Sequence, residues 1–125
     1  MPLTSLEQLN TVFPAFLKAL QANQENTTRY TNWDVSARFK LTDIGGGFTL
    51  RFAKGQISGA LDDTGPVTIG IVCKAQVLDD MFSGRLDAES AYMMGRITLE
   101  GSEYTAESLL SYLPAIRTAW KQAMP

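Results

Sequence analysis

Side chains that could carry out chemistry are few in this sequence. It contains no histidine, which removes the commonest general base, the commonest metal ligand and every Ser-His or Cys-His dyad. The single cysteine, Cys73, therefore has no histidine to activate it, and we expect a buried or structural thiol. The sequence accordingly predicts neither a metal site nor a cofactor.

Adjacent acids and a glycine cluster are the remaining candidates. Asp62 and Asp63 form one acid pair, and Asp79 and Asp80 form another. Neighbouring residues point to different faces of a strand or helix, so we expect a solvated turn and a solvated helix face rather than catalytic dyads. The glycines at 45–47 lack the Lys-Ser/Thr and the helix that follow in a phosphate-binding loop, which favours a turn between strands. We therefore expect a protein that is not an enzyme.

The composition is that of one globular domain spanning residues 1–125. Hydrophobic residues make up 45% of the chain and charged residues 19%, enough for a real core. The net charge of −2 gives no general attraction to polyanions, which argues against nucleic acid as a partner. No apolar run approaches the roughly 20 residues that span a bilayer, and no secretory leader is visible. We expect a cytoplasmic protein without stable membrane insertion.

Three basic residues fall on the polar side of the first predicted hairpin: Arg38, Lys40 and Arg51. Solvent, or an acid such as Glu100 on the same sheet face, would neutralise them in the simpler interpretation. In the other interpretation they form a weak patch for anionic lipid head groups or an acidic partner, which would allow transient contact with a membrane surface.

Helical periodicity marks both ends of the chain. Apolar residues recur at spacings of three and four over residues 4–21, which predicts an amphipathic helix. Thr4 and Glu7 have the spacing of a capping box at its start, and Pro14 is expected to kink or divide it. The C-terminal segment shows the same periodicity around Pro114.

Between these helices the period changes to two. Alternating apolar and polar residues predict strands at 35–42, 48–52, 56–61, 67–71 and 97–100. The first four are joined mostly by tight turns, which favours antiparallel pairing. One face of each strand is apolar, so the helices should cover a single face. The predicted fold class is α+β, with a five-stranded, mainly antiparallel sheet and helices packed on one face.

Two short helices precede the last predicted strand, and a polar connection precedes the first predicted strand. The helices are predicted at 74–83, ended by Gly84, and at 88–94, capped by Asp87. Residues 21–34 form the connection. The apolar residues of the helices are either plain core or the wall of a pocket, and the adaptable methionines suit a wall that accepts varied apolar shapes.

The segment from Phe82 to Gly101 resembles the signature of the sterol carrier protein type 2 lipid-binding family. The recurring elements of that signature appear here as Gly84, Leu86-Asp87, Ala91, Met94-Gly95, Ile97, Leu99 and Gly101. Upstream, residues 48–52, Gly55 and residues 67–69 resemble the family's hairpin and following strand. The resemblance covers about residues 35–113 and implies the fold of that family.

The same resemblance implies non-catalytic binding of a lipid or other apolar ligand, such as a fatty acyl chain, a sterol-like molecule or an isoprenoid, in a hydrophobic tunnel between sheet and helices. The residues expected to line it are Phe39, Leu50, Phe52, Ile69, Leu78, Phe82, Met94, Leu109 and Leu113. The alternative is a scaffold or dimerisation module with a filled core, acting as accessory to a partner lipid-metabolising enzyme. Both a monomer and a homodimer fit the sequence.

Overall fold

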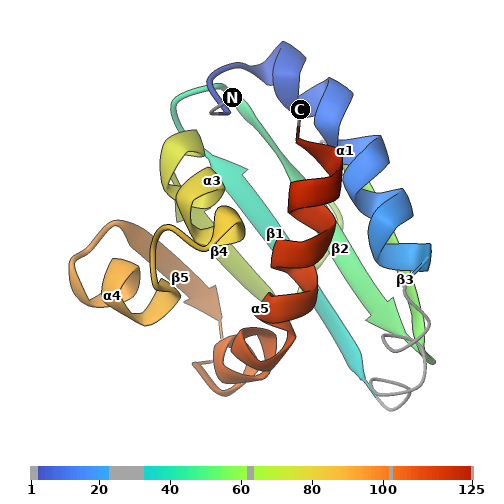
Figure 1. The fold of residues 1–125 in the computed structure, drawn as a ribbon. Helices are drawn as coiled ribbons and strands as arrows, with labels where there is room; N and C mark the ends of the chain where they lie inside the picture. The colour runs from blue at the N-terminus through green and yellow to red at the C-terminus, as the bar shows by residue number, and fades with distance from the viewer. Residues whose placement is uncertain (1–2, 23–32, 62–63, 102, 125) are drawn as a thin grey trace.

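A computed structural model describes residues 3–22, 33–61, 64–101 and 103–124 of the protein. Most of the predicted connection at 21–34, and the acid pair Asp62-Asp63, lie outside the described residues. Along the chain the elements are α1 (Leu6–Ala22), β1 (Asp34–Leu41), β2 (Gly46–Ala53), β3 (Gln56–Leu61), β4 (Ile69–Cys73), α3 (Ala75–Ser83), α4 (Ala88–Met93), β5 (Ile97–Gly101) and α5 (Glu103–Ala123) (Figure 1).

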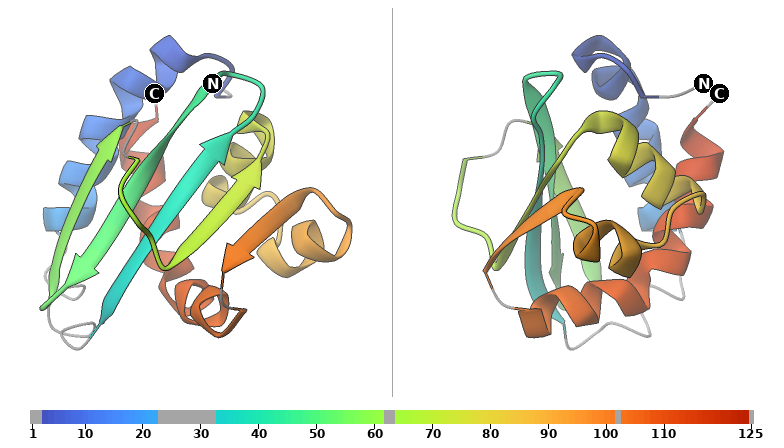
Figure 2. Two further views of the ribbon diagram at one scale, coloured as in Figure 1. Left: turned by 180° about the vertical axis from the view of Figure 1, so that it is seen from behind. Right: turned by 90° about the vertical axis from the view of Figure 1, so that its left-hand side faces the viewer.

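The five strands form one mixed sheet in the order β3-β2-β1-β4-β5. Three of its pairings are antiparallel, and β1 with β4 is parallel. The helices all lie on one face of this sheet (Figure 2). The predicted fold class is therefore confirmed. The parallel pair arises because the chain after β3 crosses the sheet to reach the far side of β1.

This crossover lies on the sheet face that carries no helices, and two of the predicted basic residues hold it there (Figure 2). Arg38 donates a hydrogen bond to the carbonyl of Gly65, and Arg51 donates one of 3.1 Å to the carbonyl of Pro66. Glu100 lines the same outer face as Arg38 and Lys40. Arg38 and Arg51 thus bond to backbone carbonyls of the crossover, a role that neither interpretation of the basic residues predicted.

The helical layer packs through aromatic side chains. Phe16 of α1 lies with its ring centroid 5.2 Å from that of Trp120 in α5 and 5.8 Å from that of Phe82 in α3. Phe82 in turn contacts Phe39 of β1 at 5.4 Å. Such tilted and edge-on contacts add to the stabilisation from apolar burial. This cluster fixes α1, α3 and the second part of α5 over the sheet.

Both long helices continue through their prolines, so of the two outcomes expected of Pro14, a kink or a division of the helix, the division does not occur. The cap of α1 is also one residue later than predicted, because Ser5 Oγ, not the Thr4 side chain, accepts the 3.1 Å hydrogen bond from the Gln8 amide. Figure 2 shows α5 changing direction along its length, as an internal proline such as Pro114 favours. The bend carries its first part away from α1 and toward α4.

Asp79 corrects the prediction of a solvated helix face. Its side chain is 2% exposed. One carboxylate oxygen accepts a 2.8 Å hydrogen bond from Trp120 Nε1, and the other accepts bonds from the Leu3 amide at 3.2 Å and from Arg85 Nη2 at 3.1 Å. Asp80 beside it is partly exposed and pairs with Arg85 Nε. Asp79 therefore joins the chain start, α3 and the end of α5.

Local signals place α4 as the sequence predicts. Gly84 ends α3 with a positive φ of 85°, a conformation that glycine adopts without strain. The Asp87 carboxylate caps α4 by accepting a 3.1 Å bond from the Ser90 amide. Together these caps turn the chain so that α4 lies beside the edge strand β5 (Figure 1).

Candidate ligand-binding pocket

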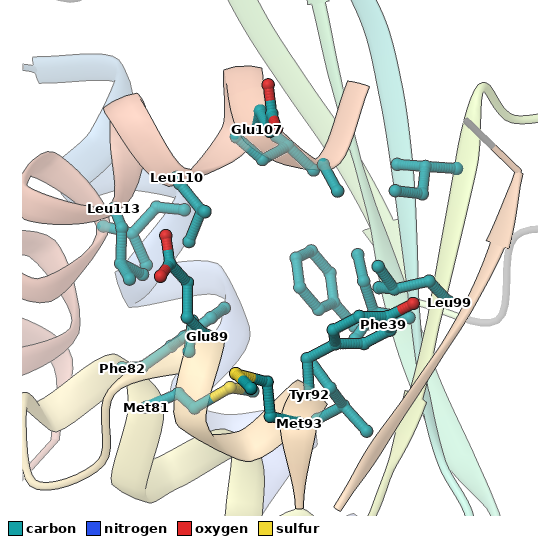
Figure 3. A pocket seen from close by; sticks show the side chains of 17 residues that line it. Phe39, Met81, Phe82, Glu89, Tyr92, Met93, Leu99, Glu107, Leu110 and Leu113 are labelled. Atoms are coloured by element: carbon teal, nitrogen blue, oxygen red, sulfur yellow. The ribbon is translucent and has the colours of Figure 1, made fainter. Parts of the chain in front are cut away.

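A cavity of about 330 Å³ lies between the inner face of the sheet and three helices. Apolar side chains from the sheet and the helices surround a common open space (Figure 3). The sheet contributes Phe39, Ile69, Ile71, Ile97 and Leu99; α3 contributes Met81 and Phe82; α4 contributes Ala88, Glu89, Tyr92 and Met93; and α5 contributes Ala106, Glu107, Leu109, Leu110, Leu113 and Ile116. Its size is at the lower end of the range for small-molecule sites.

Small side chains keep the space open. Ala88 of α4 and Ala106 of α5 each present only a methyl group to the cavity. The bend of α5 also carries its first part away from α1 (Figure 2). The sheet half formed by β4 and β5 is therefore roofed by helices that do not fill the space beneath them.

The cavity reaches solvent at α4. Its deep wall includes Phe39, Ile69 and Phe82, all buried. By contrast, Met93 is 85% exposed and Tyr92 is 45% exposed, although both line the cavity. We call the exposed lining residues Glu89, Tyr92 and Met93 of α4, with Glu107 of α5, the rim (Figure 3). An apolar molecule could enter there without crossing the packed core.

A protein-family model matches most of the chain, including most of the residues that line the cavity. The model of the SCP-2 sterol transfer family matches residues 16–113. The chain belongs to the SCP-2 sterol transfer family. Membership indicates lipid binding or transfer in general terms, and it confirms the resemblance carried by the segment from Phe82 to Gly101. No curated protein matches the sequence of this SCP-2 chain.

Solved structures share the fold of the SCP-2 chain. A crystal structure of sterol carrier protein 2 has a TM-score of 0.71 at 14% identity, over 90% of this chain and 95% of that chain. Sterol Carrier Protein-2 from Aedes aegypti, solved in complex with the C16 fatty acid palmitate, has a TM-score of 0.61 at 14% identity, over 92% and 98%. At such identities the likeness shows the fold alone.

The same fold also forms part of a larger protein. The sec-alkylsulfatase Pisa1 from Pseudomonas sp. has a TM-score of 0.62 at 16% identity, covering 68% of the SCP-2 chain. The SCP-2 chain matches only 14% of that protein's length.

The predicted lining residues of the SCP-2 chain divide into two groups. The structure brings five of them together at the cavity: Phe39, Ile69, Phe82, Leu109 and Leu113. It places the other four outside the lining, with Met94 58% exposed on the surface and the rest fully buried in the core: Leu50, Phe52 and Leu78. Contact of the first five with a ligand stays a prediction.

The sequence reasoning missed several lining residues, above all Tyr92 and Met93. Their spacing of three and four from Glu89 places all three on one face of α4. The signal was therefore present in the periodicity. The family signature points instead to Met94, which ends the helix in the structure.

Cys73 has no role at the cavity. Burial, and to a lesser degree the nearby charge of Asp43, raise the pKa of its thiol to about 12. The thiol therefore stays protonated near neutral pH and is a poor nucleophile. Within the described residues, no group of three or more acids and cysteines is placed to hold a metal ion.

The helices of the chain are short or polar relative to a membrane-spanning segment. In the part of the chain that the structure describes, none is both long and apolar enough to cross a membrane.

Proposed function

We propose that this protein is a non-catalytic carrier that binds the apolar chain of a lipid in the cavity between α3, α4, α5 and the sheet. The observation that carries the proposal is an apolar cavity of about 330 Å³, open at α4, in a member of the SCP-2 sterol transfer family. A fatty acyl, sterol-like or isoprenoid chain matches the apolar wall. A filled core is the premise of the scaffold alternative, and the cavity argues against it.

The energetics suit reversible carriage. Burying about twelve methylene groups at ~0.8 kcal/mol each would contribute roughly 10 kcal/mol before costs. Association and ordering of the chain remove a large part of this. The remainder corresponds to a dissociation constant on the order of micromolar, so cargo could be released without a chemical step.

Loading and release would take place at the rim. Large apolar side chains are exposed at and near it, namely Tyr92, Met93, Met94 and Tyr104, and they suit transient contact with a membrane surface. The cargo could also pass to a partner enzyme, and the occurrence of this fold within a long sec-alkylsulfatase chain supports such a partnership.

Extraction of the protein from its host, followed by mass spectrometry, tests the proposal. We expect a lipid with a long apolar chain to co-purify reproducibly, because the cavity offers it a dry wall. A chain with Leu113→Trp should retain much less of the same lipid, since Leu113 lines the cavity. Recovery of a partner protein with no lipid, from both chains alike, would favour the scaffold alternative.

A further inference from the structure

The charge at the rim of the cavity has one sign only. Two of the 17 lining residues carry a charge, and both are glutamates, Glu89 of α4 and Glu107 of α5. Among the residues that the structure describes, no lysine or arginine lines the cavity. A ligand held there would therefore meet two carboxylates and no cation from the wall.

The two carboxylates come from helices on different sides of the opening. In Figure 3 Glu89 extends from α4 toward Leu113 of α5, and Glu107 lies on α5 beyond Leu110. Within the described residues, neither glutamate has an ion-pair or hydrogen-bond partner. Arg85, at the start of the segment leading to α4, is occupied by Asp79 and Asp80. The Glu89 carboxylate is thus free to contact a ligand, whereas the Glu107 carboxylate points away from the open space in Figure 3 and would act on a ligand through its charge.

The direction of a bound lipid follows from burial. The deep wall, with Ile69 and Phe82, is buried and apolar, whereas Glu89 and Glu107 are exposed. An apolar tail would lie against the deep wall, and the polar end of the lipid would stay at the rim, where water is available. The polar end would therefore lie in the field of both glutamates.

Electrostatics then distinguishes lipids by their polar ends. A carboxylate head group would be repelled by Glu89 and Glu107, and no cation among the described lining residues would offset that repulsion. A hydroxyl or an ammonium group can donate a hydrogen bond to the Glu89 carboxylate, and the ammonium also gains charge attraction from both glutamates. Repulsion of the wrong ligand is an effective route to specificity.

We propose, on the basis of the proposed function, that Glu89 and Glu107 make this carrier select lipids whose polar end donates hydrogen bonds and carries no negative charge, and reject free fatty-acid anions. The class includes long-chain alcohols, phenols and amines. The selection acts through the rim, while the apolar wall accepts the chain.

A matched series of single-chain ligands tests the proposal. Dodecylamine, dodecanol and dodecanoate share one chain and differ in the polar end, and each would displace the neutral fluorescent probe N-phenylnaphthylamine at neutral pH. We expect affinity to fall in the order amine, alcohol, acid, with the acid about tenfold or more weaker than the alcohol. The difference should shrink at high salt because rim charges are screened.

Substitutions at the rim identify the cause. In a chain carrying Glu89→Gln and Glu107→Gln, dodecanoate should bind about tenfold more tightly and dodecylamine more weakly. Dodecanol should lose less affinity than dodecylamine, because it carries no charge and a glutamine Oε1 still accepts its hydrogen bond. Glu100→Gln makes the same change of charge on the outer face of the sheet, and it should leave the order unchanged.

The outcomes separate this inference from the proposed function. Equal affinity for acid and alcohol, or a dodecanoate affinity that the double substitution leaves unchanged, would overturn the selection while leaving the carrier intact. Failure of all three ligands to displace the probe would overturn both.

Discussion

Replacing Leu109 with tryptophan should abolish most lipid binding while the protein stays folded. Leu109 of α5 is half-buried and lines the cavity, so an indole there would occupy space that the ligand needs. Loss of even a few buried methylene contacts at ~0.8 kcal/mol each corresponds to an affinity about 30-fold lower or worse. Displacement of N-phenylnaphthylamine by dodecanol would measure the loss.

Met94→Trp is the matched control for this substitution. It introduces the same indole on the neighbouring helix, but at a residue that is 58% exposed and outside the lining. Its lipid affinity should stay within about twofold of the original. Circular dichroism and thermal unfolding would show that both variants are folded. A folded Leu109→Trp variant that binds as tightly as Met94→Trp would contradict the assignment of the cavity as the binding site.

Asp79→Ala should destabilise the protein by about 3–5 kcal/mol, the largest effect we expect from a polar substitution. The change would leave the buried Trp120 Nε1 and the Leu3 amide without the acceptor that they share, and unpaired buried donors are costly. Urea-induced unfolding would measure the change in the free energy of unfolding.

Asp80→Ala supplies the comparison for Asp79. Asp80 is the next residue on α3 and pairs with the same arginine, Arg85, at 3.1 Å, but it is partly exposed. Exposed ion pairs contribute ~1 kcal/mol at most, so we expect a small loss. An equal decrease in the free energy of unfolding for both substitutions would contradict this account, because it would show that the buried Asp79 carboxylate stabilises the fold no more than the partly exposed ion pair of Asp80.

The secondary structure could be predicted largely from local pattern. The period-two alternation around Phe39 identifies β1, and the glycine at position 84 and the cap at Asp87 identify the ends of α3 and α4, because each depends on neighbouring residues only. The burial of Asp79 could not be predicted in this way. Its partners Leu3 and Trp120 lie 76 and 41 residues away along the chain, and local pattern contains no information about them.

The cavity could be predicted in part, because the alternation of a strand shows its apolar face but not which stretch of that face remains uncovered. Leu50 and Ile69 have the same local pattern, yet Leu50 lies in the packed core and Ile69 at the cavity. The difference depends on where α1 and the two parts of α5 pack. Similarly, Met93 and Met94 are adjacent in the sequence, yet neighbouring residues of a helix point in different directions. Met93 therefore lines the cavity, whereas Met94 lies outside it on the surface.

The most direct test of the carrier is detection of a lipid chain inside the cavity by nuclear Overhauser effects between dodecanol and methyl-labelled protein. We predict contacts from the alkyl chain to the methyl groups of Ile69, Leu109 and Leu113, which line the cavity, and none to those of Leu50 or Leu78 in the core. Saturating dodecanol with no contact to any cavity methyl group would contradict the account.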